Sequence, residues 1–372
     1  MKILVTGGAG FIGSHLVDAL VEKGHEVLIY DNFEPQVHKT EPEYLNRNAE
    51  LIRADVRDKN TLKNAVMDTE IIFHQAAMVG VGQSMYQVEK YVDVNTFATA
   101  KLLDILANEE HSVKKLIVAS SMSIYGEGAY QCDGCGMVYP ALRLEEQLMN
   151  RQWEMTCPNC GKVVKPMPTD EAKPLQPTSI YAVTKKDQEE MCLAVGRAYG
   201  IPTVALRYFN VYGSRQSLNN PYTGVCAIFS SRIKNKNTPL IFEDGLQSRD
   251  FVSVHDIVEA NILAMASQNA DYEVFNVGTG NTISILEIAQ TLVKLYNENL
   301  NPEVTNKYRA GDIRHCFADI AKIKDRLGYK PKVDFEPGMK ELVEWGEKEE
   351  AVDKFEVAHE ELLRRGLVED AL

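Results

Sequence analysis

The sequence predicts an α/β protein with a doubly wound parallel sheet, a smaller C-terminal lobe and an inserted, cysteine-rich segment. Short apolar runs such as KILVTG, EVLIYD, IIFHQAA and KLIVASS alternate with longer segments up to about residue 120. Longer segments such as SHLVDALVEKG carry apolar residues at spacings of three and four, the period of a helix with one buried face. The alternation stops between residues 127 and 168 and then resumes, which indicates an insertion.

The composition is that of a globular protein with more than one lobe. Of its 372 residues, 45% are hydrophobic and 25% are charged, and no stretch is apolar enough to cross a bilayer. A formal net charge of -13 argues against nucleic-acid binding, which needs clustered Lys and Arg, so an anionic substrate requires a locally basic site. The first strand begins at Lys2 and leaves no room for a signal peptide, so we expect a cytoplasmic location.

The first strand leads into a glycine-rich turn, TGGAGFIG at residues 6–13, and then a helix. Gly7 permits the tight turn, Gly10 lets the backbone approach a pyrophosphate, and Gly13 allows the helix to pack closely on the strand. Asp31 ends the second strand, where its carboxylate can bind both ribose hydroxyls and disfavour the phosphate of NADP. These features predict a Rossmann-like NAD site; the alternative is a glycine-rich turn that binds nothing. Asp55 follows the third strand and would lie beside the adenine, although alone it suggests a surface loop.

The predicted catalytic groups follow the strand KLIVASS and begin a later helix. Open parallel sheets bind ligands at the carboxyl ends of their strands, and Ser121 is placed there to contact a sugar hydroxyl. Tyr181 and Lys185 are four residues apart, which puts them on one face of the helix expected from about Tyr181 to Tyr199. An ammonium and a nicotinamide cation both favour the phenolate, so Tyr181 can remove a hydroxyl proton. Without this context, a surface pair is the simpler interpretation.

Two cysteine pairs give the insertion, residues 127–168, the spacing of a structural zinc ribbon. Cys132 and Cys135 form one pair, and Cys157 and Cys160 form the other. Four thiolates leave no open position on the metal, so a structural zinc-ribbon-like knuckle is expected, with a redox pair or two disulfides as the alternative. The insertion begins after Gly126 and ends before the catalytic tyrosine, so we expect it to flank the cleft, where it could act as a lid.

Together these segments resemble the extended short-chain dehydrogenase/reductase family of nucleotide-sugar epimerases and dehydratases. The matching pieces are TGGAGFIGSH, DNF, ADVRD, HQAA, VNTFATAKLLD, SSMSIYG, YAVTK, RYFNVYG, SRDFVSVHD and FNVGTG, which cover nearly the whole chain except the insertion. The resemblance implies NAD as cofactor, a nucleoside-diphosphate sugar as substrate, and a homodimer formed through the helices of Asn95 and Tyr181.

The resemblance also implies the residues of each site. Cofactor contacts fall on Gly7, Gly10, Phe11, Ile12, Gly13, Asp31, Asn32, Asp55, Val56, Ala76, Ala77, Asn95, Lys185 and Tyr208, with Asn95 also supporting the active-site helix. Substrate contacts fall on Ser123, Asn210, Arg249, Arg309 and Asp312, and reaction chemistry on Ser121, Tyr181 and Lys185. Arg249 and Arg309 would clamp the diphosphate, because guanidinium groups match phosphate oxygens. Without the resemblance, Asn210 is a turn residue and Arg309 a solvated charge.

A departure from the family pattern narrows the reaction to epimerisation. Relatives that eliminate water carry an Asp-Glu pair directly after the position of Ser121, and UDP-glucuronate decarboxylases carry a Glu in that stretch, but here Met122 and Ser123 follow. Elimination needs an acid and a base beyond the tyrosine. We expect oxidation of a sugar carbinol, most often at carbon 4, and reduction from the opposite face, so that NAD is regenerated within each cycle.

The substrate and several alternatives stay open at this level. The insertion and the segment GDIRHC, residues 311–316, resemble bacterial enzymes that epimerise dTDP-L-rhamnose, with UDP-hexose or UDP-N-acetylhexosamine as the alternative. A dehydratase, a net oxidoreductase and a non-catalytic NAD-binding interaction protein are the other hypotheses. We expect an NAD-binding core over 1–126 and 169–215, a mainly sugar-nucleotide-binding lobe over 216–346 with some returns to the core, and a solvated helical tail over 347–372.

Overall fold

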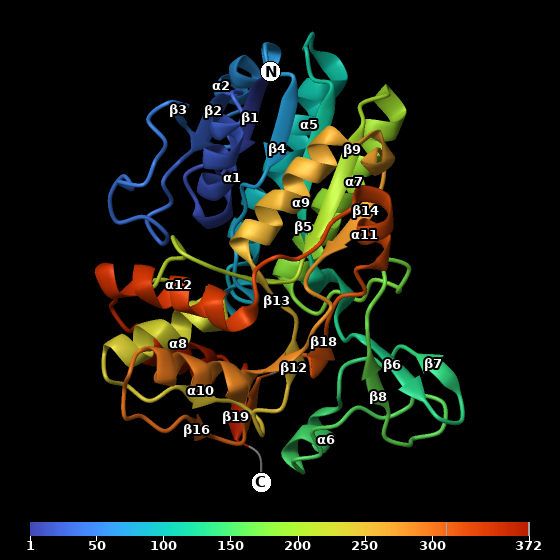
Figure 1. Cartoon of the computed structure of the whole chain (residues 1–372). Coiled ribbons are helices and arrows are strands. Elements are labelled where there is room, and N and C mark those ends of the chain that lie inside the picture. Colours follow the sequence, from blue (N-terminus) through green and yellow to red (C-terminus); the bar gives the residue numbers. More distant parts are fainter. Residues whose placement is uncertain (310, 371–372) are drawn as a thin grey trace.

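The computed structural model describes residues 1–309 and 311–370, and its larger lobe is a seven-stranded sheet in the order β14-β9-β5-β4-β1-β2-β3 (Figure 1). The strands are β1 (Lys2–Thr6), β2 (Glu26–Asp31), β3 (Glu50–Arg53), β4 (Ile71–His74), β5 (Lys115–Ser121), β9 (Thr203–Tyr208) and β14 (Val274–Val277). Every neighbouring pair is parallel. The strand order reverses between β1 and β4, where such sheets bind ligands. The predicted doubly wound parallel sheet is confirmed.

Two helical layers cover this sheet because its strands are apolar on both faces. In β1, Ile3 and Val5 belong to one buried cluster and Leu4 belongs to the other. The first cluster includes residues of α1 (Phe11–Glu22), α9 (Val254–Ala266) and α11 (Ala321–Leu327). The second includes residues of α2 (Lys59–Met67), α5 (Ala98–Asn108) and α7 (Ile180–Tyr199). None of the helices among the described residues is long and apolar enough to cross a membrane.

The smaller lobe has a separate core and several short strands. Its helices are α8 (Val225–Lys234), α10 (Ile285–Leu295) and α12 (Phe335–Lys348), which share one apolar cluster. Its pairs are β10 (Asn210–Tyr212) with β13 (Phe251–Ser253), β11 (Leu240–Ile241) with β16 (Glu303–Val304), and β17 (Lys307–Arg309) with β19 (Val368–Asp370). Strand β12 (Ser248–Arg249) lies between β15 (Ile283–Ser284) and β18 (His315–Cys316). The chain returns to the larger lobe with α9, β14 and α11.

Short helical segments complete the path of the chain. They are α3 (Val81–Ser84), α4 (Val88–Tyr91), the π-helical turn η1 (Val92–Phe97), and the 3-10 turns η2 (Met122–Tyr125) and η3 (Gln268–Ala270). Turn η1 leads directly into α5, and α7 packs against both. This contact brings the Asn95 segment beside the helix that carries Tyr181.

The insertion folds as a small antiparallel unit beside the smaller lobe (Figure 1). Strands β7 (Gly136–Val138), β6 (Ala129–Cys132) and β8 (Lys165–Met167) form its sheet in that order, and α6 (Glu145–Met149) is its helix. A cluster of buried residues that includes Tyr130, Met155 and Val164 surrounds two of the cysteines. The insertion therefore has a small core of its own and contacts the smaller lobe where β8 meets β18.

The tail differs from the solvated helix expected over residues 347–372. Helix α13 (Phe355–Arg364) does form, but Leu362 and Val368 are buried against Phe242. The chain then turns at Gly366, with φ +66°, and β19 pairs antiparallel with β17. Apolar residues at helical spacing on α13 give the tail a face to bury, and its last strand covers an edge that would otherwise be exposed.

Candidate active site

The glycine-rich turn joins β1 to α1 and has no room for side chains at two of its glycines. Gly7 has φ +70°, and a Cβ atom there would lie 2.8 Å from the backbone nitrogen of Ala76. A Cβ atom on Gly13 would lie 2.1 Å from the carbonyl oxygen of Gly7. Gly10 is the N-cap residue of α1 and has no side chain to cover the first N–H groups. Phe11 and Ile12 begin the helix. The turn therefore offers a helix N-terminus to an anion, as pyrophosphate binding requires.

A pocket beside this turn is lined by residues at the carboxyl ends of four neighbouring strands and by one residue of η1. Those named from the sequence are Gly7, Asp31, Asn32, Val56 and Ala77. Those that sequence reasoning missed are Tyr30, Glu34, Ala54, Met78 and Val94. Most of the missed residues adjoin named ones at the strand ends, so the position of the strand ends was the available signal. Ala76 also lies at the end of β4, where its N–H donates to the Thr6 hydroxyl at 3.3 Å. The pocket and the turn lie together at the carboxyl ends of the strands, where doubly wound sheets bind dinucleotides.

Acidic groups at this pocket are tied to the backbone and to one arginine. The Asp31 carboxylate accepts hydrogen bonds from the N–H groups of Ala9 at 3.0 Å and Phe33 at 2.9 Å. Hydrogen bonds from Arg57 hold the pKa of Asp55 at about 2. Asp55 also accepts a 2.7 Å hydrogen bond from the Asn32 amide. Asp55 therefore carries its charge at neutral pH and orients Asn32, which is a more specific role than that of a solvated loop carboxylate.

The predicted reaction residues gather where β5 ends and α7 begins. Ser121 is the last residue of β5, and its Oγ accepts hydrogen bonds from the N–H of Ser123 at 3.2 Å and the Ser123 hydroxyl at 2.9 Å. Ser179 caps α7 by accepting from the N–H of Ala182, so Tyr181 lies in the first turn. Burial raises the pKa of Tyr181, and a hydrogen bond with Ser121 opposes that rise. The structure thus brings Ser121 of β5, Ser123 of η2 and Tyr181 of α7 together.

Lys185 lies one turn beyond Tyr181 and is almost fully buried. Its Nζ donates to Oε1 of Gln188 at 2.8 Å, and burial lowers the pKa of Lys185 to about 8. Sequence reasoning missed Gln188, although its position three residues after Lys185 on the same helix face was a usable signal. The amide of Gln188 in turn donates to Oγ1 of Thr99 at 2.8 Å. The lysine is therefore positioned from α5 as well as from its own helix.

A buried network of neutral groups continues from Thr99 toward the glycine-rich turn. Nε2 of His74 lies 2.9 Å from Oγ1 of Thr99, and Nδ1 of His74 lies 2.8 Å from Oγ1 of Thr6. Burial lowers the pKa of His74 to about 3, so the imidazole is neutral at physiological pH. The network connects the end of β1 with the helix of Lys185. The only sequence signal was the HQAA motif, which did not show the partners of its histidine.

Asn95 and Tyr208 are both enclosed by protein groups. Oδ1 of Asn95 accepts from the N–H of Met78 at 2.8 Å, and its amide donates to Oγ1 of Thr184 at 3.0 Å. Asn95 thus ties α7 to the loop after β4. The Tyr208 hydroxyl donates to Oδ1 of Asn261 at 3.0 Å, and Tyr208 is buried in the core next to the site.

The predicted phosphate-binding groups meet around one carboxylate in the smaller lobe. A carboxylate oxygen of Asp312 lies 3.5 Å from Nη2 of Arg249, and another lies 3.7 Å from Nε of Arg309. Arg249 is buried on β12, whereas Arg309 is exposed at the end of β17, with its guanidinium over the ring of Phe242. Asn210 begins β10, and its buried Oδ1 has no hydrogen-bond partner within the part of the chain that the structure describes. These side chains form a basic site with an unused acceptor nearby.

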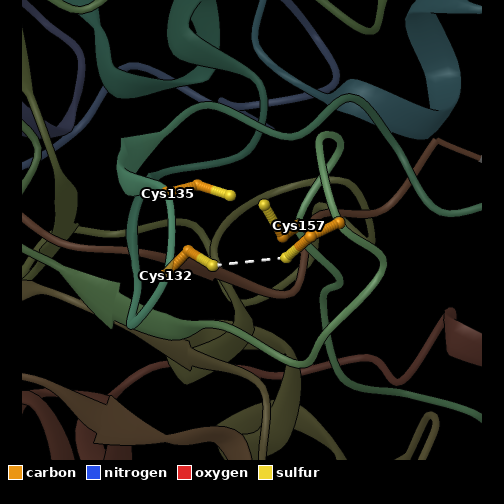
Figure 2. Close-up of side chains that lie close together, drawn as sticks. Cys132, Cys135 and Cys157 are labelled. Atoms are coloured by element: carbon orange, nitrogen blue, oxygen red, sulfur yellow. Dashed lines mark hydrogen bonds between the residues drawn. The ribbon is translucent and has the colours of Figure 1, made fainter.

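The four cysteines of the insertion converge on one point. Their sulfur atoms all lie within 4.8 Å of one another. Figure 2 shows Cys132, Cys135 and Cys157 pointing toward a common centre. The sulfurs of Cys132 and Cys160 are 3.6 Å apart, and every cysteine is free across residues 1–309 and 311–370. Burial raises the pKa of Cys157, but backbone N–H groups oppose this and the pKa falls to about 7. The cluster can supply four thiolate ligands, and it contains no disulfide.

Comparison with known sequences and structures shows one consistent group of relatives. Residues 3–138 match the profile of the "NAD dependent epimerase/dehydratase family", and residues 160–342 match that of "GDP-mannose 4,6 dehydratase". The chain is 37% identical to dTDP-L-rhamnose 4-epimerase of Burkholderia thailandensis, over 92% of this chain and 94% of that relative.

Solved structures give the same result. UDP-glucose 4-epimerase of Thermotoga maritima, solved with UDP-glucose, is 33% identical with a TM-score of 0.75, and the match covers 94% of this chain and 99% of that one. UDP-glucuronic acid 4-epimerase of Bacillus cereus, solved with UDP-glucuronic acid and NAD, is 28% identical with a TM-score of 0.76 at the same coverage.

Proposed function

The chain belongs to the NAD-dependent epimerase/dehydratase family, and on this premise we propose that it is an NAD-dependent nucleotide-sugar 4-epimerase. The observation that carries this proposal is the convergence of Ser121 and Tyr181 at the carboxyl end of β5, with Lys185 one turn further along α7. Epimerisation is favoured over dehydration because Met122 and Ser123 stand where relatives that eliminate water carry an acidic pair.

In this proposal the protein moves one proton while the substrate is held in place. Bound NAD would supply reversible hydride transfer at the sugar carbon, and the configuration of that carbon would invert when the hydride comes back to its opposite face. Tyr181 takes the proton of the same carbinol and later gives it back, and the Ser121 hydroxyl hydrogen-bonds the reacting oxygen. Burial raises the pKa of Tyr181 and so opposes formation of the phenolate that must accept this proton. The positive charge of Lys185 favours the phenolate, which makes proton removal possible at neutral pH.

The turn at residues 6–13 would hold the NAD pyrophosphate, and Asp31 would bind the adenosine ribose. Two observations support these assignments. The backbone packs too closely at Gly7 and Gly13 for a side chain, and Asp31 lines the pocket beside the turn. Asn32, Asp55, Val56 and the residues after β4 would line the adenine side. Lys185 would hold the nicotinamide ribose.

Arg249, Arg309 and Asn210 would bind the diphosphate of the substrate. The Asp312 carboxylate between the two arginines keeps them close together, and phosphate oxygens can replace it as their partner. The relative from Burkholderia thailandensis supports dTDP-L-rhamnose as the substrate. The Thermotoga maritima structure, which contains UDP-glucose, supports a UDP-hexose as the second candidate.

We also propose a structural zinc ion held by Cys132, Cys135, Cys157 and Cys160. Four sulfurs within 4.8 Å of one another suit a tetrahedral thiolate site, and free thiols suit a reducing cytoplasm. Metal analysis of purified protein should find about one zinc per chain and should find that Cys157→Ser lowers it. Cys226→Ser, a buried cysteine in the smaller lobe, should leave the zinc content unchanged. Equal zinc in both variants would reject the site.

A homodimer formed through α7 and the segment before α5 is the proposed assembly. Val88, Val92 and Phe97 are exposed on that segment, and Val183 is exposed on α7, which packs against it. Exposed apolar side chains that lie side by side are typical of a protein interface. No nucleic acid or membrane is proposed as a partner.

The function is tested with a panel of nucleotide sugars. Purified protein incubated with dTDP-L-rhamnose, UDP-glucose or UDP-N-acetylglucosamine should convert one of them to its 4-epimer, and the same final ratio should be reached from either epimer. Stoichiometric NADH release would instead indicate a net oxidoreductase, and loss of water from the sugar a dehydratase. A folded, NAD-bound protein that converts none of these would favour the non-catalytic alternative.

A further inference from the structure

Ion pairs join the inserted segment to the smaller lobe. This ion-pair cluster consists of Arg143 and Glu154 from the insertion and Glu243, Asp244 and Arg314 from the lobe. Nη2 of Arg143 lies 2.8 Å from Glu243, and Nη1 of Arg314 lies 3.0 Å from the same carboxylate. Arg314 also lies 2.6 Å from Glu154 and 2.7 Å from Asp244. The side chains of Arg143, Glu243 and Arg314 are at most 3% exposed, so losing either arginine leaves the buried Glu243 carboxylate with one cation in place of two.

The same insertion holds the backbone of the loop at residues 311–316. The buried Glu127 carboxylate accepts hydrogen bonds from the N–H groups of Arg314 and His315. Nη2 of Arg143 donates to the carbonyl oxygen of Asp312 at 3.1 Å. Hydrogen bonds from His315 and Arg314 hold the pKa of Glu154 at about 2, so this carboxylate stays ionised. Side chains of the insertion therefore contact three backbone groups of the loop.

This loop in turn determines where Arg249 points. Nη1 of Arg249 donates to the carbonyl oxygen of Arg314 at 2.8 Å, and Nη2 donates to that of Ile313. Nη2 also lies 3.5 Å from the Asp312 carboxylate. These three acceptors belong to the loop that the insertion holds, and Nη1 also donates to the carbonyl oxygen of Ser248 on β12 at 2.9 Å. A displacement of the loop would therefore move the buried guanidinium group with it.

A second contact connects the insertion to Arg309. Leu148 and Trp153 of the insertion form a buried apolar cluster with Tyr308, the middle residue of β17. Arg309 is the next residue along this strand. The insertion therefore supports both arginines, one through polar contacts with the loop and one through apolar packing on β17.

We infer that the insertion is a positioning device for the substrate-phosphate site, in which Arg143 and Glu154 set the orientation of Arg249 while Leu148 and Trp153 fix the location of Arg309. The inference rests on the proposed function for the assignment of the substrate phosphates to these two arginines. Tyr181 and Lys185 are held by other elements, β5 and α5, and not by this cluster. The insertion should therefore affect substrate binding and leave cofactor binding unchanged.

The test measures binding of UDP and of dTDP to the NAD-loaded protein by calorimetry. Arg143→Met should weaken binding of the preferred nucleotide by about tenfold or more, because a misplaced clamp loses its contacts, while the affinity for NAD stays the same. KM for the sugar nucleotide should rise by a similar factor with little change in kcat. Lys165→Met is the matched control, since it removes one positive charge from the insertion at a side chain that is 78% exposed.

A second variant covers the case in which Arg143→Met does not fold. Glu154→Gln replaces a side chain that is 46% exposed, so it is expected to fold, and it should weaken nucleotide binding in the same direction by a smaller factor. If every variant that folds binds the nucleotide with the affinity of the wild type, the inference is overturned and the proposed function still stands. A folded, NAD-binding wild type that binds neither nucleotide would contradict the proposed function as well.

Discussion

The dinucleotide half and the substrate half of this molecule hold their functional side chains by different means. In the dinucleotide half, the residues lie at strand ends and on one helix face, and the contacts behind Lys185 run through neutral side chains such as Thr99 and His74. In the substrate half, Arg249 depends on a loop whose own place depends on the ion-pair cluster.

This difference indicates which property of the protein a substitution should change in each half. The side chains behind Lys185 are neutral and hydrogen-bonded to one another, so the charge in this network is the buried ammonium of Lys185 itself. Arg314 is entirely buried and pairs with Glu243, Asp244 and Glu154. Its loss would remove the cation that offsets the cost of taking these carboxylates out of water. Substitutions in the first half should therefore change chemistry, and substitutions in the second half should change stability and position.

The largest expected effect is chemical and falls in the dinucleotide half. Tyr181→Phe should lower kcat by about a thousandfold, since it removes the group that transfers the proton, and it should leave NAD affinity unchanged. Steady-state kinetics and NAD titration measure the two quantities. Tyr199→Phe, an exposed tyrosine at the other end of α7, is the control. A fully active Tyr181→Phe enzyme would overturn the assigned mechanism.

The next effect is structural and falls in the substrate half. Arg314→Met should lower the free energy of unfolding by about 3 kcal/mol, because it removes a fully buried cation that pairs with Glu243, Asp244 and Glu154. Arg326→Met, at a side chain that is 48% exposed and paired with Glu273, should cost less than about 1 kcal/mol. Urea unfolding compares them. Equal losses in the two variants would remove the contrast between buried and exposed pairs.

A pH effect should distinguish the buried lysine of the dinucleotide half. Burial lowers the pKa of Lys185 to about 8 from 10.5, so between these values the unfolded chain binds more protons than the folded one. As the pH rises from 8 to 10.5, the free energy of unfolding of the wild type should therefore increase relative to that of Lys185→Met. The difference should grow by at most about 1.4 kcal/mol per pH unit.

Thermal unfolding of the protein without cofactor at several pH values measures this difference. Lys186→Met, on the same helix with a side chain that is 33% exposed, is the control and should keep the pH profile of the wild type. A Lys185→Met protein whose stability follows the wild type across this pH range would show that the buried ammonium has no such cost.

The smallest expected effect concerns the choice of cofactor. Asp31→Asn should weaken NAD binding by about tenfold, because a charged acceptor for the ribose hydroxyls is lost. It should also narrow the preference for NAD over NADP, since the carboxylate no longer repels the phosphate. Asp58→Asn changes an exposed carboxylate that caps α2 and should leave both affinities unchanged. Unchanged cofactor selectivity in Asp31→Asn would remove this role from Asp31.

Sequence periodicity was sufficient for the dinucleotide half because that half follows local rules. The glycine-rich turn, the end of β2 at Asp31 and the spacing of Tyr181 and Lys185 all depend on residues within one turn or one strand end. The cysteine spacing likewise predicted a cluster, and the four sulfurs do converge. The apolar alternation predicted the parallel sheet, although not that β14 would become its edge strand.

Only the tertiary structure decided how distant segments meet. It alone placed Asp312 between Arg249 and Arg309, paired β19 with β17, and joined the insertion to the smaller lobe through Arg314. The physical reason is that these contacts are made by long polar side chains and strand edges far apart in the chain. Local backbone geometry repeats with a period that can be read along a sequence, whereas the choice among many possible charged partners is made only when the chain is packed.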